Sequence, residues 1–102
     1  MPTYKLSPLA ELDYFEILDY TLEKWGIQQF EKYRDVLKGT ILRLAQSPTL
    51  GKRCEDIHPD LYRYGAGHHI IFYRIAGEGI EIARILHERM DVPRHFPYSG
   101  DD

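Results

Sequence analysis

The chain has 102 residues, 43% of them hydrophobic, so it is long enough to form a single domain with its own core. Its net charge of −3 argues against a nonspecific nucleic-acid binder, and no apolar run approaches the length of a membrane span. The single cysteine, Cys54, excludes an internal disulfide, and residues 1–5 have no signal-peptide pattern. We therefore expect one soluble, cytoplasmic domain over residues 1–102.

Residues 3–6 are a candidate for a short strand, and a helix is predicted directly after them. Ser7 is suited to the N-cap and Pro8 to the first helical position. Apolar side chains then recur every three or four positions, as is typical of an amphipathic helix. They are Leu12, Phe15, Leu18, Leu22 and Trp25. Gly26 is suited to a left-handed C-cap that ends this helix.

A second helix is predicted to begin near Ile27 and to end at Ser47-Pro48. Its apolar stripe consists of Phe30, Tyr33, Leu37, Ile41 and Leu44. Because the link at Gly26 is so short, the two helices should form an antiparallel hairpin. One partner helix cannot cover both stripes, so we expect the hairpin to lie on a sheet.

Three strand-like runs, residues 61–64, 68–75 and 80–87, follow an irregular segment at residues 49–60. Glycine-containing turns bracket the middle run, which favours antiparallel hairpins. Both faces of the middle run are apolar, so it is predicted to be an inner strand, covered on one side and half covered on the other. The predicted fold is α+β with the order β-α-α-β-β-β, a helical hairpin on a small antiparallel sheet. Residues 97–102 should form a frayed tail.

The apolar positions of these elements also predict which side chains form the core between hairpin and sheet. They are Leu12, Phe15, Leu22, Phe30, Leu37, Ile41, Leu44, Ile71, Tyr73, Ile82 and Leu86. Large-to-small substitutions at such sites should cost roughly 2–5 kcal/mol.

Motifs for several kinds of site are missing from the sequence. The five histidines lack the spacing of a zinc motif, and His68 and His69, as neighbours on a strand, should point to opposite faces. There is no nucleophile elbow and no phosphate-binding glycine loop, and no His or Asp partner is evident for Cys54. We expect neither a metal nor another cofactor.

Metal-free RNA cleavage needs only a cluster of side chains that bind phosphate and move protons. Candidates of the right types are Arg63, Arg84, His87, Arg89, Arg94 and His95, of which a ribonuclease would use Arg63, Arg84, Arg89 and His95. Strand alternation places Arg84 and His87 on opposite faces, so these two meet only if the strand bulges. The simpler interpretation is that the arginines form ion pairs on a solvated face. The pairs would join Arg63, Arg74 and Arg84 to Glu81, Glu88 or Asp60.

An ordered series of short motifs covers residues 4–96. The series is Tyr4-Lys5-Leu6-Ser7-Pro8-Leu9-Ala10-Glu11-x-Asp13, Trp25-Gly26, Leu44-x-x-Ser47-Pro48-x-x-Gly51, Leu61-Tyr62-Arg63, His69-Ile70-Ile71-Phe72-Tyr73-Arg74 and Ile80-Glu81-Ile82-x-Arg84-Ile85-Leu86-His87-x-Arg89-Met90-Asp91. It resembles ParE-type toxins of the RelE/ParE toxin–antitoxin superfamily. The resemblance implies the β-α-α-β-β-β fold and a toxin that inhibits DNA gyrase, a type II topoisomerase, and so blocks replication.

RelE-like members of the superfamily instead cut mRNA on the ribosome, and this alternative stays open. Arg89 would then stand in the place of the family's C-terminal arginine. The place of the catalytic tyrosine falls near His95 or Phe96, and the lysine-rich stretch is reduced to Lys52-Arg53. These departures favour the ParE-like interpretation, in which the protein inhibits by binding and not as an enzyme. A third alternative is a non-toxic protein that only binds its antitoxin.

The resemblance also implies a cognate antitoxin, bound through a segment that is disordered when free. Exposed edges of a small open sheet are templates for strand addition, and arginines attract an acidic partner. The predicted partner surface consists of Trp25, Ile17, Tyr20, Arg63, Arg84 and Arg89. For Trp25 the alternative is a cap on the hairpin's own core. We expect no membrane contact and no sequence-specific nucleic-acid binding.

Overall fold

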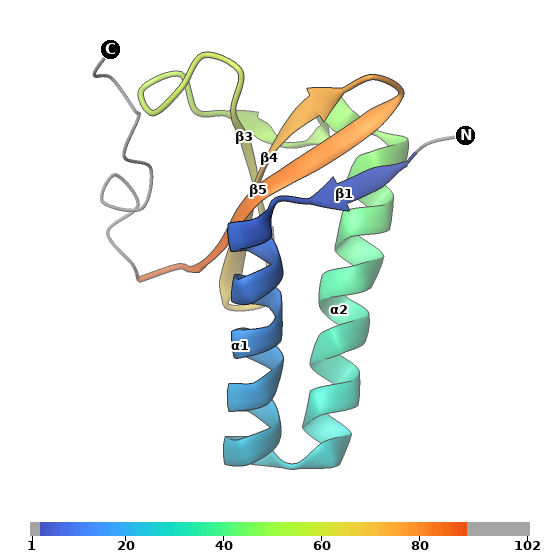
Figure 1. The fold of residues 1–102 in the computed structure, drawn as a ribbon, viewed down its shortest axis with the longest axis vertical. Coiled ribbons are helices and arrows are strands. Elements are labelled where there is room, and N and C mark those ends of the chain that lie inside the picture. Colours follow the sequence, from blue (N-terminus) through green and yellow to red (C-terminus); the bar gives the residue numbers. More distant parts are fainter. Residues whose placement is uncertain (1–2, 90–102) are drawn as a thin grey trace.

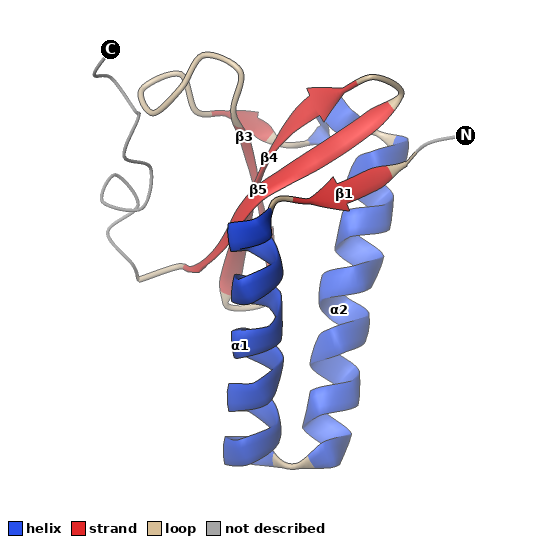
Figure 2. Ribbon diagram, viewed as in Figure 1, coloured by secondary structure: helices blue, strands red, loops and turns tan. Residues whose placement is uncertain are grey.

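The structure, a computed structural model, describes residues 3–89 and consists of two helices packed on a five-stranded mixed sheet. The elements are β1 (Tyr4–Leu6), α1 (Pro8–Trp25), α2 (Ile27–Gln46), the short 3-10 helix η1 (Pro48–Leu50), β2 (Lys52–Arg53), β3 (Tyr62–Ala66), β4 (His69–Ala76) and β5 (Gly79–His87). The strand order is β1-β5-β4-β3-β2 (Figure 2). The predictions for His95 and the tail at 97–102 lie outside the described residues.

The predicted class and order of elements are confirmed, and two features of the sheet differ from the prediction. β2 pairs with β3 inside the segment predicted to be irregular. β1 runs parallel to β5, with Tyr4 opposite Ile80 and Leu6 opposite Ile82, which makes the sheet mixed instead of antiparallel. The first strand, β1, is therefore an edge strand of the sheet and lies next to the last strand, β5.

The helical hairpin turns at a single residue. Gly26 has φ +91°, a conformation that favours glycine, and it serves as the C-cap of α1 and the N-cap of α2. Its N–H donates to the carbonyl of Leu22 at 3.0 Å, and its own carbonyl accepts from the N–H of Phe30 at 3.0 Å. Figure 1 shows the two helices side by side, with this turn projecting away from β1.

Tyr73 fixes the path of the chain from α2 into the sheet. Its ring is fully buried, and its hydroxyl donates to the carbonyl of Pro48 at 2.8 Å and accepts from the N–H of Gly51 at 2.9 Å. A Cβ at position 51 would collide with that hydroxyl and with the carbonyl of Arg63. Contact with Tyr73 therefore explains why glycine occupies the last position of the motif Ser47-Pro48-x-x-Gly51.

Side chains on the two faces of the sheet form two separate clusters. The larger lies between the helices and the sheet and includes Leu37, Ile41, Leu44, Ile71, Tyr73 and Ile82, all predicted core residues, with Phe30 packed at its margin. The smaller, on the opposite face, joins Phe72 and Leu86 to residues 54, 57 and 61 of the loop before β3. β4 is an inner strand, as its two apolar faces predicted. Both faces are covered at Ile71, Phe72 and Tyr73, where the prediction had one face only half covered, and residues 74–76 are exposed. Leu86 is buried as predicted, but under this loop and not under the hairpin.

The predicted orientation of the first helix is wrong. Leu12, Phe15 and Leu22 are exposed, the first two at 58% and 60% of their surface. The face that packs on the sheet carries a different stripe, made of Ala10, Tyr14, Ile17, Leu18 and Thr21. Its small members, Ala10 and Thr21, are buried. This helix has two apolar arcs, and contacts with β5, described below, decide which of them faces inward.

A bulge in β5 explains why Leu86 changes sides. Phe72 is opposite Arg84 but Tyr73 is opposite Ile82, so Ala83 is an extra residue on β5. The extra residue reverses the alternation of side chains beyond it. Ile82 and Ile85 therefore both face the helices, and Leu86 faces the loop.

We predict that Leu37→Ala destabilises the protein by about 3 kcal/mol, because Leu37 is fully buried between hairpin and sheet. Leu12→Ala is the matched control, and its effect should stay within about 1 kcal/mol because Leu12 is largely exposed. Urea denaturation followed by circular dichroism measures both. Equal losses for the two variants would contradict the observed orientation of α1.

Candidate functional site

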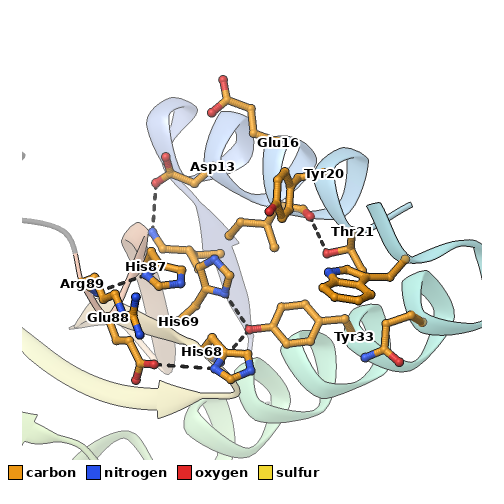
Figure 3. A pocket seen from close by; sticks show the side chains of 14 residues that line it. Asp13, Glu16, Tyr20, Thr21, Tyr33, His68, His69, His87, Glu88 and Arg89 are labelled. Carbon is orange, nitrogen blue, oxygen red and sulfur yellow. Dashed lines mark hydrogen bonds and ion pairs between the residues drawn. The ribbon is translucent and has the colours of Figure 1, made fainter. Parts of the chain in front are cut away.

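The described residues form a groove of about 890 Å³ between α1, the first half of α2 and the ends of β4 and β5. We call it the histidine groove. It is lined by Asp13, Glu16, Ile17, Tyr20, Thr21, Trp25, Gln29, Tyr33, His68, His69, Ile85, His87, Glu88 and Arg89. Its half towards the helical turn is apolar and aromatic, and its half at the end of β5 is made of titratable side chains (Figure 3).

Three histidines that no sequence motif groups lie together in this groove. His69 is directly opposite His87 in the sheet, and their ring centroids are 5.3 Å apart in a T-shaped arrangement. His68 precedes β4, so strand alternation does not apply to it, and its Nδ1 lies 3.6 Å from Glu88. The bulge is responsible, because a regular hairpin closed at Ala76 and Gly79 would pair His69 with Leu86.

Tyr33 of α2 ties the β3–β4 turn to the helices. Its hydroxyl oxygen lies 2.6 Å from Nδ1 of His69 and 3.1 Å from the carbonyl of Ala66, and it accepts from the backbone N–H of His68 at 2.9 Å. Gly67, at φ +62°, lies against the ring of Tyr33, where a Cβ would collide with it. Burial raises the pKa of Tyr33, so the phenol stays protonated at neutral pH.

His69 is held in its neutral form. Burial lowers its pKa from 6.5 to about 4, and repulsion from His87 and His68 adds to the effect, while Glu88 and Asp13 oppose it. A neutral, half-buried imidazole beside a second imidazole is an arrangement that suits hydrogen bonding or proton transfer at the groove floor.

Asp13 closes the groove where α1 meets β5. Its carboxylate accepts from Nε and from a terminal nitrogen of Arg84, each at 2.8 Å, and from the backbone N–H of Ile85 at 2.9 Å. The side chains of Asp13 and Arg84 are only 11% and 16% exposed. Their pairing therefore links helix and sheet in a water-poor environment.

The structure brings only some of the predicted partner-binding residues together. Ile17, Tyr20, Trp25 and Arg89 all line the histidine groove. Trp25 is 66% exposed, so most of its ring does not cap the hairpin core. Arg63 is exposed and opposite Phe72, which places it on the sheet face away from the helices.

The ion pairs expected of the arginines are partly confirmed. Arg74 pairs with Glu81 at 2.7 Å, as predicted. Arg84 pairs with Asp13 of α1, a partner that the sequence analysis did not consider. Of the four residues assigned to RNA cleavage, Arg89 lies in the groove, Arg84 beside it and Arg63 on the other face, while His95 lies outside the described residues.

Other chemistries find little support in residues 3–89. No group of three His, Cys, Asp or Glu side chains there is placed to hold a metal ion. Cys54 is buried in the smaller cluster, and burial raises the pKa of its thiol, which disfavours the reactive thiolate. Neither of the described helices is long and apolar enough to cross a membrane.

Comparisons with known proteins agree with one another. Residues 4–92 match the family described as "ParE toxin of type II toxin-antitoxin system, parDE". The chain is 44% identical to "Toxin ParE1" of Mycobacterium tuberculosis over 94 residues, covering 91% of this chain and 96% of the relative. It is 37% identical to "Toxin ParE" of Escherichia coli, covering 90% of each. The fold matches a chain of the "Chromosomal ParDE TA system from P. aeruginosa" with a TM-score of 0.71 and 20% identity, over 85% of this chain and 96% of that one.

We predict that Asp13→Ala destabilises the protein by about 3 kcal/mol, because it removes a carboxylate that binds the nearly buried Arg84 and the backbone N–H of Ile85. Asp19→Ala removes the same group from an exposed position of α1 and should change stability by less than about 0.5 kcal/mol. Thermal unfolding measures both. A small effect at Asp13 would mean that this contact does not fix the helix.

Proposed function

The chain belongs to the ParE toxin family of type II toxin–antitoxin systems, and on that premise we propose that it inhibits DNA gyrase and is neutralised by a cognate antitoxin that docks in the histidine groove. Inhibition would proceed by protein–protein contact, with DNA breaks accumulating and replication stopping. The gyrase target and the antitoxin are inferred from family membership, and the docking site from the geometry of the groove.

The observation that supports the docking site is the concentration of exposed aromatic and apolar side chains at one end of the groove. Tyr20 and Trp25 are both more than half exposed, although such rings are costly to leave in water. Ile17 lies between them and the core cluster. A partner segment that covers these three side chains would gain apolar burial on a preformed surface, as helix-in-groove recognition does.

The groove also offers polar anchors at its other end. Arg89 and the three histidines lie where the segment would continue beyond the apolar half. A segment that spans both halves would combine apolar burial with directed hydrogen bonds, the usual composition of a specific interface. If the gyrase-contacting surface overlaps the groove, the antitoxin would neutralise by occlusion.

Expression of the chain without antitoxin should arrest growth, and the purified protein should inhibit supercoiling by gyrase or accumulate the cleaved complex. Addition of the antitoxin should restore supercoiling. Purified gyrase, relaxed plasmid and gel electrophoresis provide the measurement. Unchanged supercoiling and cleavage at saturating toxin would contradict gyrase as the target without affecting family membership.

Trp25→Ala should weaken antitoxin binding by about 2 kcal/mol, roughly 30-fold in Kd, because exposed tryptophans in a groove are typical binding hot spots. Phe15→Ala is the matched control, since Phe15 is an exposed aromatic of the same helix on its outer face. Its Kd should change less than about threefold. Isothermal titration calorimetry with purified antitoxin measures both, and equal losses would place the binding surface elsewhere.

A second candidate function is ribosome-dependent mRNA cleavage. The observation that favours it is the presence of Arg89 beside His69 and His87, the residue types of metal-free phosphodiester cleavage. Primer extension on transcripts after induction separates the two functions. Codon-aligned cuts that disappear in Arg89→Ala would favour ribonuclease activity over gyrase inhibition.

A further inference from the structure

A further step rests on the proposed function and concerns the chemistry of the antitoxin segment: we propose that the histidine groove binds an acidic segment and that His69 takes up a proton when it does. The segment places a carboxylate at the β5 end of the groove and an apolar side chain against Tyr20 and Trp25. The affinity of the complex then rises as the pH falls.

The hydrogen bonds of the Tyr33 hydroxyl accommodate both protonation states of His69. The Tyr33 hydroxyl has one proton and two acceptors, Nδ1 of His69 at 2.6 Å and the carbonyl of Ala66 at 3.1 Å. When Nδ1 is bare, the hydroxyl donates to it. When His69 is protonated, Nδ1 donates to the hydroxyl oxygen, and the hydroxyl proton turns to Ala66.

Neither state requires the backbone to move. The N–H of His68 donates to the Tyr33 oxygen at 2.9 Å, and that oxygen has two lone pairs, enough for this bond and for one from Nδ1. The Tyr33 hydroxyl and the Ala66 carbonyl can therefore satisfy the hydrogen bonds of a charged His69 without rearrangement of the turn between β3 and β4.

His87 and Arg89 supply hydrogen-bond donors next to His69. Nδ1 of His87 accepts from the backbone N–H of Arg89 at 3.1 Å, so a neutral His87 carries its proton on Nε2. No described residue accepts a hydrogen bond from that Nε2, and no buried side-chain nitrogen among residues 3–89 lacks a partner, so Nε2 is open to solvent. Arg89, whose side chain carries a positive charge, lines the same end. These donors suit a carboxylate, which only accepts.

Most acidic side chains near His69 already have partners within the protein. The charged and titratable residues that line the groove with it are Asp13, Glu16 and Tyr20 from α1, Tyr33 from α2, His68 before β4, and His87, Glu88 and Arg89 from the end of β5, with Arg84 paired to Asp13. Asp13 is held by Arg84 and Ile85, and Glu88 lies 3.6 Å from His68. Asp13 and Arg84 cancel each other, and the Glu16 carboxylate points away from His69 (Figure 3). Glu88 then stands against Arg89 and a protonated His69, so the β5 end of the groove presents a net positive charge to an incoming carboxylate.

The direction of the pH effect follows from linkage. In the free protein the pKa of His69 is about 4, lowered by burial and by repulsion from His87 and His68. A bound carboxylate raises this pKa, because it favours the charged form. Between the free and the bound pKa the complex holds one proton more than its parts, and its affinity gains about tenfold for each unit by which the pH falls. Above the bound pKa the affinity is constant.

Calorimetric titration of the full chain with its cognate antitoxin tests this. The experiment runs at about pH 6 and pH 8, each in two buffers of different ionisation enthalpy, which gives the number of protons taken up. We expect proton uptake at the lower pH and tighter binding there, by up to about tenfold for each pH unit between the free and the bound pKa of His69. His69→Asn should lose most of the uptake, whereas His58→Asn, which alters a histidine in the loop before β3, should keep it.

The outcomes separate this inference from the proposed function. Absence of antitoxin binding at every pH would overturn both. Tight binding without proton uptake, or with uptake unchanged in His69→Asn, would overturn only the acidic-segment inference. Nuclear magnetic resonance titration of the wild-type histidines does not depend on a variant that folds. It should show the pKa of His69 rising on binding, and an unchanged or lower pKa would contradict the inference.

Discussion

The arrangement of helices and sheet depends on how the edge of β5 is satisfied where β1 ends. β1 pairs with β5 only as far as Ile82, so on this edge the next backbone groups of β5 have no neighbouring strand, although β4 pairs with the other edge. Ser7 donates its N–H to the carbonyl of Ile82 at 2.9 Å and its hydroxyl to that of Ala83 at 2.8 Å. Asp13 accepts from the N–H of Ile85. Backbone groups this close to a core are costly to leave unpaired, so α1 must present these side chains to β5.

The same edge explains the surface of the helical hairpin. Asp13 and Ser7 fix the rotation of α1, and that rotation buries Ala10, Leu18 and Thr21. The second apolar arc, which includes Leu12 and Phe15, is left exposed as a consequence. Because the selected arc contains Ala10 and Thr21, the helix can approach the sheet closely enough for the Asp13 carboxylate to reach the backbone of β5.

The histidine groove arises from three local features acting together. The bulge at Ala83 brings His87 opposite His69, and Tyr33 holds the preceding turn so that both rings face the helices. Asp13 closes one side by pairing with Arg84, which removes two opposite charges from solvent. Family membership alone would not locate this site, since one fold supports different sites. The structure of the groove identifies the donors, acceptors and apolar side chains that family membership leaves unspecified.

The sequence by itself determined both long helices, the strands β1, β3, β4 and β5, their order, and the part of the larger core that α2 and the sheet supply. Helix ends are marked by local backbone chemistry at Ser7-Pro8, Gly26 and Ser47-Pro48. The inner position of β4 follows from its two apolar faces. Both features can be predicted without tertiary information. Tertiary structure decided the rotation of α1, because two apolar arcs were available and polar contacts with β5 chose between them. It also decided the register of β4 and β5, since one extra residue at Ala83 reverses every side chain after it. The grouping of His68, His69 and His87 follows from that register, and alternation along a single strand cannot reveal it.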